Sequence, residues 1–347
     1  MSETASCPAV PSRLPAARAS ATASLSQRWQ TPPGPQQRPT SGDPGTNDTV
    51  PERVFTPAGL DALPPPEMAR KAEQVGVAKA GMSIADTFAL SVLAGAFIAL
   101  GAIFATTVTA GGAEVPFGVL RLLGGLAFSL GLILVIVAGA ELFTGNNLIV
   151  MAWASRRVRT SQVVRNWTIV YLGNFAGALA TAGILFIGKQ YEFGDGAIGV
   201  QALSIAAAKT NLGFVQAIAL GAFCNGLVCL AVWLCYSART TTDKILSIIP
   251  PIAAFVAAGF EHSVANMFFI PMGLLVKSDE AFVSQQSGLP TLTNLTWDRF
   301  VTANLVPVTI GNIVGGALMV GAIYWFVYLR KGAGVSSAQP FSADDVG

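Results

Sequence analysis

The chain has 347 residues, of which 52% are hydrophobic and only 12% are charged. A soluble domain carries about 25% charged residues, so this composition favours an integral membrane protein. The net charge is only +2 and no basic patch occurs, so nucleic acid is not an expected partner.

The chain begins with a tail, residues 1–65, whose composition differs from the rest. The first 66 residues hold 13 of the chain's 20 prolines, a composition typical of disorder. Four arginines and a single acid, Glu3, in the first 42 residues also suit an organellar transit peptide. Pro66 to Lys79 then reads as a short amphipathic helix on the inner membrane surface.

Six segments of the membrane part, residues 66–331, have the roughly 20 apolar residues that a transmembrane helix needs. The second and fifth are too long for one simple span. A 37-residue helix would reach about 55 Å, against a hydrocarbon core of about 30 Å. A second short tail, residues 332–347, follows the last span. The predicted spans are Ile84–Thr107, Phe117–Trp153, Trp167–Ile187, Leu212–Tyr236, Ile245–Val276 and Phe300–Leu329.

Both long segments contain a polar cluster that an apolar helix should not contain. The first is Gly139-Ala-Glu-Leu-Phe-Thr-Gly-Asn146, and the second is Gly259-Phe-Glu-His-Ser-Val-Ala-Asn266. Gly, Glu and Asn recur at the same relative positions. Unwound backbone at membrane depth is tolerated only where it is packed in protein or lines a cavity. We therefore predict that spans two and five are each two half-helices joined by a loop, the pattern of a transport site.

An internal repeat relates the two halves of the membrane part. Asn166-Trp-Thr-Ile-Val-Tyr-Leu-Gly-Asn174 resembles Asn304-Leu-Val-Pro-Val-Thr-Ile-Gly-Asn312, and Gly95-Ala-Phe97 resembles Gly221-Ala-Phe223. Spans one to three therefore correspond to spans four to six. Three is odd, so the second copy must enter the bilayer from the opposite side. The prediction is an all-α membrane protein with a 3+3 inverted repeat, whose broken helices meet near the midplane.

The basic residues between the spans predict the orientation. Eleven lie beside the span ends on the side of the termini, and five lie on the other side. The positive-inside rule places both termini in the cytoplasm. We expect the inner membrane of a bacterium, with a plastid envelope as the alternative if the tail is a transit peptide. The connection Lys277–Asp298 is expected to shape an outer vestibule.

No cofactor or metal site is expected. The chain has one histidine and four cysteines without C-x-x-C spacing, too few ligands for zinc or haem. No nucleophile motif is present either, so we do not expect an enzyme. Two alternatives from other classes remain: a membrane-embedded acid–base enzyme using Glu261 and His262, and a channel for neutral solutes.

Comparison of the two polar clusters separates scaffold from chemistry. The pairs Glu141/Glu261 and Asn146/Asn266 are shared, so they are expected to satisfy the broken backbone, the carboxylates accepting from free amides. His262 has no histidine counterpart in the first cluster. Burial favours a neutral imidazole, whereas an arriving anion favours the protonated ring. An anion that took this proton would cross as a neutral acid.

Four strings occur in order along the membrane part: Ala140-Glu-Leu-Phe-Thr144, Ser237-Ala-Arg-Thr-Thr-Thr-Asp-Lys244, Phe260-Glu-His-Ser-Val-Ala-Asn266 and Asn304-Leu-Val-Pro-Val-Thr-Ile-Gly-Asn312. With them, the chain closely resembles the formate–nitrite transporter family over about Pro66 to Tyr328. The resemblance implies an aquaporin-like protomer in a homopentamer in the lipid bilayer, with one small-anion pore per protomer. Members conduct formate, nitrite, hydrosulfide, lactate or bicarbonate. Formate is the first expectation, because Ala140–Thr144 resembles the formate branch. Nitrite, bicarbonate or hydrosulfide is the alternative, because Gly145-Asn146 departs from a dedicated formate channel.

The resemblance also implies roles for individual residues. His262 takes the central role, Thr144 would hydrogen-bond the anion or the imidazole, and Asn266 would hold the break. Lys209 matches an anion-attracting vestibule lysine and Asn304 a polar vestibule position. With Glu261, these complete the expected pore set. The two constrictions that bracket His262 would be Leu132 with Phe143, and Val228 with Phe255.

Overall fold

The computed structural model of the protein describes residues 62–112 and 114–330. The predictions for residues 1–61 and 332–347 lie outside these residues. The packed part begins earlier than residue 66. The Leu63 N–H donates to the Ser237 carbonyl, and the Leu63 carbonyl accepts from the Ser237 hydroxyl at 3.0 Å.

The first helix, α1 (Pro65–Gly81), packs on protein. Met68, Ala69 and Ala72 on its apolar face are buried, and Gly76 allows it to approach η1 (Asn147–Ile149) and α5 (Val150–Ala154) closely. The predicted helix is present, and small residues bring its apolar face against the bundle. Its position at the membrane surface stays a prediction.

Six helices of the described residues are long and apolar enough to cross a membrane, as predicted. Large apolar side chains such as Phe117, Ile187 and Val215 are exposed on their outer surfaces, as expected of helices that face lipid. The six are α2 (Ile84–Thr109), α3 (Phe117–Ala138), α6 (Thr160–Ile187), α8 (Phe214–Ser237), α9 (Thr241–Ala258) and the stretch Trp297–Tyr328.

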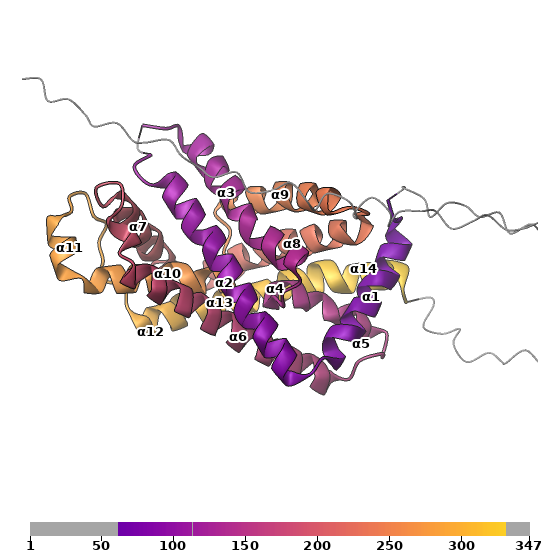
Figure 1. The fold of residues 1–347 in the computed structure, drawn as a ribbon. Coiled ribbons are helices and arrows are strands. Elements are labelled where there is room, and N and C mark those ends of the chain that lie inside the picture. The colour runs from indigo at the N-terminus through magenta and orange to yellow at the C-terminus, as the bar shows by residue number, and fades with distance from the viewer. Residues whose placement is uncertain (1–61, 113, 331–347) are drawn as a thin grey trace, which may run out of the picture. The chain divides into compact units, whose positions relative to one another are not determined.

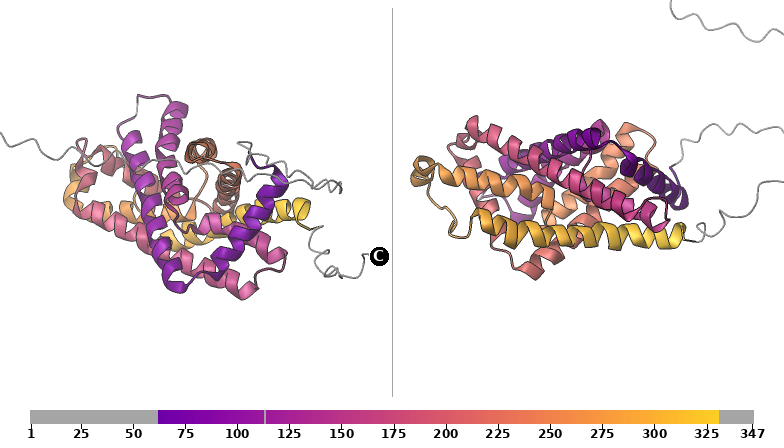
Figure 2. Two further views of the ribbon diagram at one scale, coloured as in Figure 1. Left: turned by 45° about the vertical axis from the view of Figure 1, so that its right-hand side comes forward. Right: turned by 90° about the horizontal axis from the view of Figure 1, so that it is seen from below.

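The last of these stretches is one long continuous helix (Figure 2, right). Two of its sections are π-helical, and Pro307 lies in the α-helical turn between them. Its sections are α12 (Trp297–Arg299), η3 (Phe300–Leu305), α13 (Val306–Ile313), η4 (Val314–Ala322) and α14 (Ile323–Tyr328).

Spans two and five are broken at the predicted clusters. Gly139 (φ 82°) ends α3 and Gly259 (φ 78°) ends α9, both in the left-handed conformation that glycine adopts readily. The chain resumes as α4 (Phe143–Asn146) and α10 (Ser263–Ser278). The first arms are longer than the predicted half-helices: α3 has 22 residues and α9 has 18. At 1.5 Å per residue they reach about 33 Å and about 27 Å, close to a full hydrocarbon core.

The two halves pack in the same way. In the first half α2 contacts α3 and α6, and in the second α8 contacts α9 and α13. The halves meet where α3 contacts α9 and where α6 contacts α10. A further helix, α7 (Ala197–Thr210), was not predicted. It packs on α10, and it lies at the opposite end of the bundle from α1 and α14 (Figure 1).

Two equivalent glycines allow the outer helices of each half to pack closely. A Cβ on Gly177 of α6 would overlap the Val92 carbonyl of α2, and a Cβ on Gly315 of η4 would overlap the Ala222 carbonyl of α8. Both glycines lie three residues after the repeated strings, which end at Asn174 and Asn312, so the sequence repeat extends to the same helix contact.

Candidate functional site

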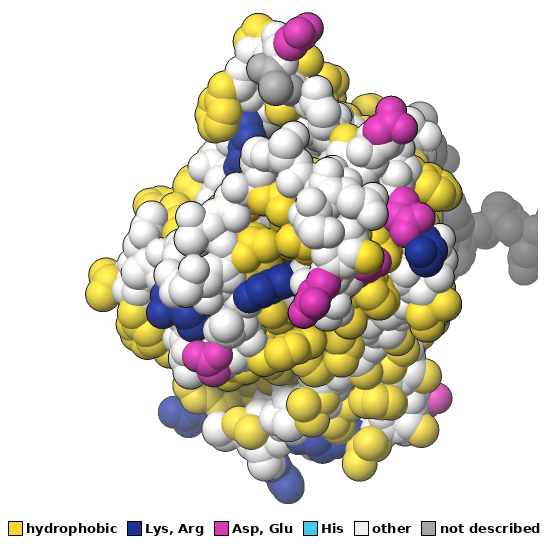
Figure 3. Space-filling model, turned by 90° about the vertical axis from the view of Figure 1, so that its left-hand side faces the viewer, with side chains coloured by type: hydrophobic (Ala, Val, Ile, Leu, Met, Phe, Trp, Pro, Cys, Tyr) yellow, Lys and Arg dark blue, Asp and Glu magenta, His cyan; other side chains and the backbone are white. Residues whose placement is uncertain are grey.

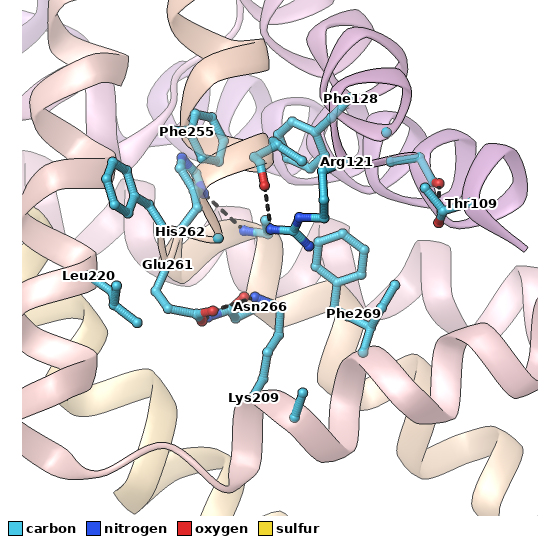
Figure 4. Close-up of a pocket in the computed structure, with 18 of the residues that line it drawn as sticks. Thr109, Arg121, Phe128, Lys209, Leu220, Phe255, Glu261, His262, Asn266 and Phe269 are labelled. Atoms are coloured by element: carbon cyan, nitrogen blue, oxygen red, sulfur yellow. Dashed lines mark hydrogen bonds and ion pairs between the residues drawn. The ribbon is translucent and has the colours of Figure 1, made fainter. Parts of the chain in front are cut away.

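Two cavities reach toward the breaks. The first, about 440 Å³, is lined by Lys209 of α7 together with Glu261 and His262; we call it the Lys209 vestibule (Figure 4). The second, about 340 Å³, is lined by Lys79 of α1 and Glu141; we call it the Lys79 vestibule. At the end where α7 and α11 (Glu280–Gln285) lie, basic and acidic side chains are scattered among apolar and uncharged polar ones, in places next to each other (Figure 3).

The connection after α10 does not form the predicted vestibule wall. Among the residues that line the Lys209 vestibule none comes from 277–298, and Gln201, Ser204 and Lys209 of α7 lie there instead. Helix α7 has no clear signal in the sequence, because its apolar stretch is shorter than a span and follows a Gly-rich turn.

A closed set of polar contacts surrounds the first break. Lys79 Nζ lies 2.6 Å from Glu141 Oε1 and donates to Asn146 Oδ1 at 3.0 Å. Asn146 Nδ2 donates to Glu141 Oε2 at 2.7 Å and to Asn166 Oδ1 at 3.0 Å. The carboxylate is therefore held by a cation and an amide, which stabilises its charge at this depth.

The second break repeats most of this set with Lys209, Glu261, Asn266 and Asn304, but Asn266 Oδ1 has no hydrogen-bond partner among the described residues. Lys209 Nζ lies 2.8 Å from Glu261 Oε1. Asn266 Nδ2 donates to Glu261 Oε2 at 2.6 Å and to Asn304 Oδ1 at 2.7 Å. Asn304 is fully buried and does not line the vestibule, unlike the expectation. It donates to the Lys209 carbonyl at 3.1 Å, so it fixes the end of α7.

Two other asparagines satisfy the backbone of the breaks. Asn174 Oδ1 accepts from the Phe143 N–H at 2.9 Å, and its Nδ2 donates to the Glu141 and Ser91 carbonyls at 2.9 and 2.8 Å. The carboxylate of Glu141 accepts from side chains and not from the free amides. The prediction that Glu141 accepts from the free backbone amides is therefore wrong, because Asn174 already accepts from the Phe143 N–H.

Asn312 does the same in the second half. Its Oδ1 accepts from the Ser263 N–H at 2.9 Å, and its Nδ2 donates to the Glu261 and Gly221 carbonyls, both at 2.9 Å. Glu261 likewise accepts from side chains. Each buried asparagine thus pairs two backbone groups of an unwound segment and also binds one carbonyl of the neighbouring helix, Ser91 of α2 or Gly221 of α8.

His262 is buried and has a partner at each ring nitrogen. Nδ1 accepts from the Ala265 N–H at 3.0 Å, so the side chain caps the N-terminus of α10. Nε2 lies 3.0 Å from Thr144 Oγ1. Because Nδ1 is an acceptor, a neutral ring carries its hydrogen on Nε2 and donates to Thr144.

The His262–Thr144 pair lies in the wall between the vestibules. His262 lines the Lys209 vestibule, while Leu142 and Gly145, on either side of Thr144 in the chain, line the Lys79 vestibule. The hydrogen-bonded pair that joins the two breaks thus connects a residue lining one cavity to a residue whose chain neighbours line the other.

The four predicted constriction residues take different places. Phe255 lines the Lys209 vestibule and stacks on His262 with ring centroids 6.0 Å apart, and Leu132 lines the Lys79 vestibule. Phe143 and Val228 are buried and line neither cavity. Phe143 instead meets the Tyr171 ring edge-on at 4.9 Å.

Several site residues were not singled out by the sequence. Phe128 meets the Phe255 ring edge-on at 5.6 Å and lines the same vestibule. Lys71 and Lys244 line the Lys79 vestibule, where burial and the nearby Lys244 and Arg239 cations lower the pKa of Lys71. The described residues contain no cluster of three or more His, Cys, Asp or Glu placed to hold a metal.

The comparisons with known proteins agree with this geometry. The formate/nitrite transporter family matches residues 66–326. The chain belongs to the formate/nitrite transporter family. It is 45% identical over 275 residues to the formate channel FocA of Escherichia coli strain K12, covering 78% of this chain and 96% of that protein. It is 43% identical to the formate channel FocA of Haemophilus influenzae, with coverages of 75% and 93%.

A solved structure described as a pentameric formate channel with formate bound has a TM-score of 0.67 and 45% identity to this chain, covering 71% of this chain and 98% of that chain. The matched relatives are named channels and transporters. The chain is therefore a multi-pass membrane transport protein and not an enzyme, and the predicted family and fold class are confirmed.

Proposed function

We propose that the protein is a channel for small monovalent anions of weak acids, with formate as the first substrate. The observation that carries the proposal is the place of the chain's single histidine, between two lysine-bearing vestibules. The formate channels among its relatives support the choice of formate. Nitrite, bicarbonate and hydrosulfide are the alternatives within the same class.

In this mechanism His262 meets the anion in the wall between the vestibules. Its Nε2–H is the hydrogen-bond donor that an arriving anion can take over from Thr144. The rings and aliphatic side chains beside it, such as Phe255 and Leu132, offer no hydrogen bonds. A bare charge is costly in such surroundings, so crossing as the neutral acid is favoured.

Delivery of a proton also involves the first turn of α10. A neutral ring cannot give up its only N–H proton without becoming an anion, so a transferred proton must come from a doubly protonated ring. In that form Nδ1 carries a hydrogen and can no longer accept from the Ala265 N–H. We therefore expect loading of the second proton to loosen the N-terminal cap of α10.

We further propose a homopentamer in a bacterial inner membrane, with both termini in the cytoplasm. The pentameric relative supports the assembly. The eleven-to-five distribution of basic residues supports the orientation. A native N-terminus processed between about residues 41 and 66 would favour the plastid alternative.

A flux panel in liposomes tests the substrate class. Purified protein is reconstituted, and the flux of formate, nitrite, ammonia and water is compared with that of protein-free liposomes. We expect formate and nitrite to cross faster than in the control, with no increase for ammonia or water. Accelerated ammonia or water flux without anion flux would contradict the proposal, and nitrite faster than formate would favour the nitrite alternative.

A further inference from the structure

The surplus positive charge of the Lys209 vestibule does not come from Lys209, the lysine that the sequence suggests for attracting the anion. Its charged lining residues are Arg121, Lys209 and Glu261. Lys209 lies 2.8 Å from the carboxylate of Glu261, so its charge is largely offset. Two cations and one anion leave a net charge of +1, which is the charge of Arg121.

Arg121 is bound to neutral groups at the end of α9. Its Nε donates to the Ala257 carbonyl at 3.2 Å, and its Nη2 donates to the Val256 carbonyl. Figure 4 shows the guanidinium pointing to this helix end, beside Phe128 and Phe269. No carboxylate of the described residues forms a salt bridge with Arg121, and Glu261 interacts with it only at longer range. The part of its positive charge that does not offset the helix end is therefore available to the cavity.

The C-terminal end of α9, where Arg121 binds, lies close to His262 and so affects an anion that approaches the histidine. The last carbonyls of a helix lack intrahelical partners and carry the negative end of its dipole. α9 ends at Gly259, three residues before His262, and both residues line the vestibule. Without a cap these carbonyls would repel an anion that approaches His262.

The first break has no such cap. The equivalent carbonyls at the end of α3 belong to Ile136 and Val137, and no arginine within the described part of the chain donates to them. There the surplus charge comes from Lys71 and Lys244, beyond the Lys79–Glu141 pair. Arg121 is therefore not part of the repeated scaffold.

We propose that Arg121 is a positioning residue for the anion in the Lys209 vestibule. It offsets the negative end of α9 and supplies the unpaired positive charge that attracts the anion, while Lys209 mainly holds Glu261. This inference rests on the proposed anion channel.

Three variants separate its charge from its hydrogen bonds. Arg121→Gln removes the charge, and Arg121→Lys keeps the charge but loses the two-point cap. Arg299→Gln is the matched control: Arg299 donates its Nε and Nη2 to the Thr210 carbonyl at the end of α7, at 3.2 and 3.0 Å, but does not line the vestibule. The readouts are half-saturation for formate, its ionic-strength dependence and thermal stability.

Arg121→Gln should raise half-saturation about five- to tenfold at low salt and flatten the salt dependence, because one surplus charge is lost. Arg121→Lys should keep wild-type half-saturation with lower thermal stability. Arg299→Gln should lower thermal stability without a change in half-saturation. Unchanged half-saturation in Arg121→Gln, or the same increase in Arg299→Gln, would overturn the inference.

A second variant covers the case in which Arg121→Gln does not fold. Gln201 lines the same vestibule, and Gln201→Glu brings the net charge of the lining to zero with little change in shape. It should raise half-saturation as Arg121→Gln does, and a wild-type value would overturn the inference. The two proposals fail in different ways: if wild-type protein passes no anion, the proposed function fails, whereas active variants with wild-type half-saturation refute only the role of Arg121.

Discussion

The two helix breaks share a scaffold and differ in the residues beside the passage between the vestibules. In both, a lysine pairs with a glutamate and one asparagine amide binds the glutamate and a second asparagine, while Asn174 or Asn312 pairs the free backbone groups. Only the second break carries a histidine, and among the described residues only the helix before it, α9, has an arginine bound to its last carbonyls. The shared contacts stabilise an unwound segment in apolar surroundings. We infer that the residues that differ, His262 and Arg121, bind the anion and guide it.

The largest effect is expected from the asparagines that satisfy the breaks. Asn174→Ala and Asn312→Ala each leave two buried backbone groups of a break unpaired, at about 1–3 kcal/mol for each group. Both variants should lose most of their folded yield and thermal stability, to a similar extent. Asn294→Ala, which removes an exposed contact to Asn211, should behave as wild type. Full tolerance of one break variant and not the other would show that the two scaffolds are not equivalent.

A smaller effect is expected from the carboxylates. Glu141→Ala and Glu261→Ala should each lower the free energy of unfolding by about 1–3 kcal/mol, because each leaves a partly buried lysine and an asparagine amide without their carboxylate partner. Folded yield and the thermal midpoint should fall accordingly. The double variant Lys79→Met/Glu141→Ala should recover part of the loss, since no uncompensated charge remains. Normal expression and normal thermal stability of the single variants would contradict this role.

The smallest effect is expected from the tail. Removal of the first 60 residues should leave assembly and anion flux unchanged, because this segment has few apolar residues to pack. Removal through Gly81 should instead abolish folding, since it takes away α1 and the Lys79 partner of Glu141. Size-exclusion chromatography and flux measurements compare the two truncated proteins. Dissociation of the assembly after removal of only the first 60 residues would contradict the prediction.

Much of the fold could be predicted because membrane spans and breaks are encoded locally. Apolar length marks the six spans, and Gly139 and Gly259 mark the ends of the broken helices. The link between Lys79 and Lys209 could not be predicted. They are 130 positions apart while the glutamates are 120 apart, so insertions hide the correspondence. The partners of Asn174 and Arg121 depend on helix packing, which no local pattern contains.

The central claim, protonation at His262, is tested most directly by the pH dependence of formate flux. Wild type and His262→Asn are reconstituted, and their formate flux is compared between about pH 5 and 8, with protein-free flux subtracted. Wild-type flux should rise as the pH falls, because a protonated ring is required, and the variant should show no such dependence and a sharply altered flux. A wild-type pH profile in His262→Asn would contradict the account.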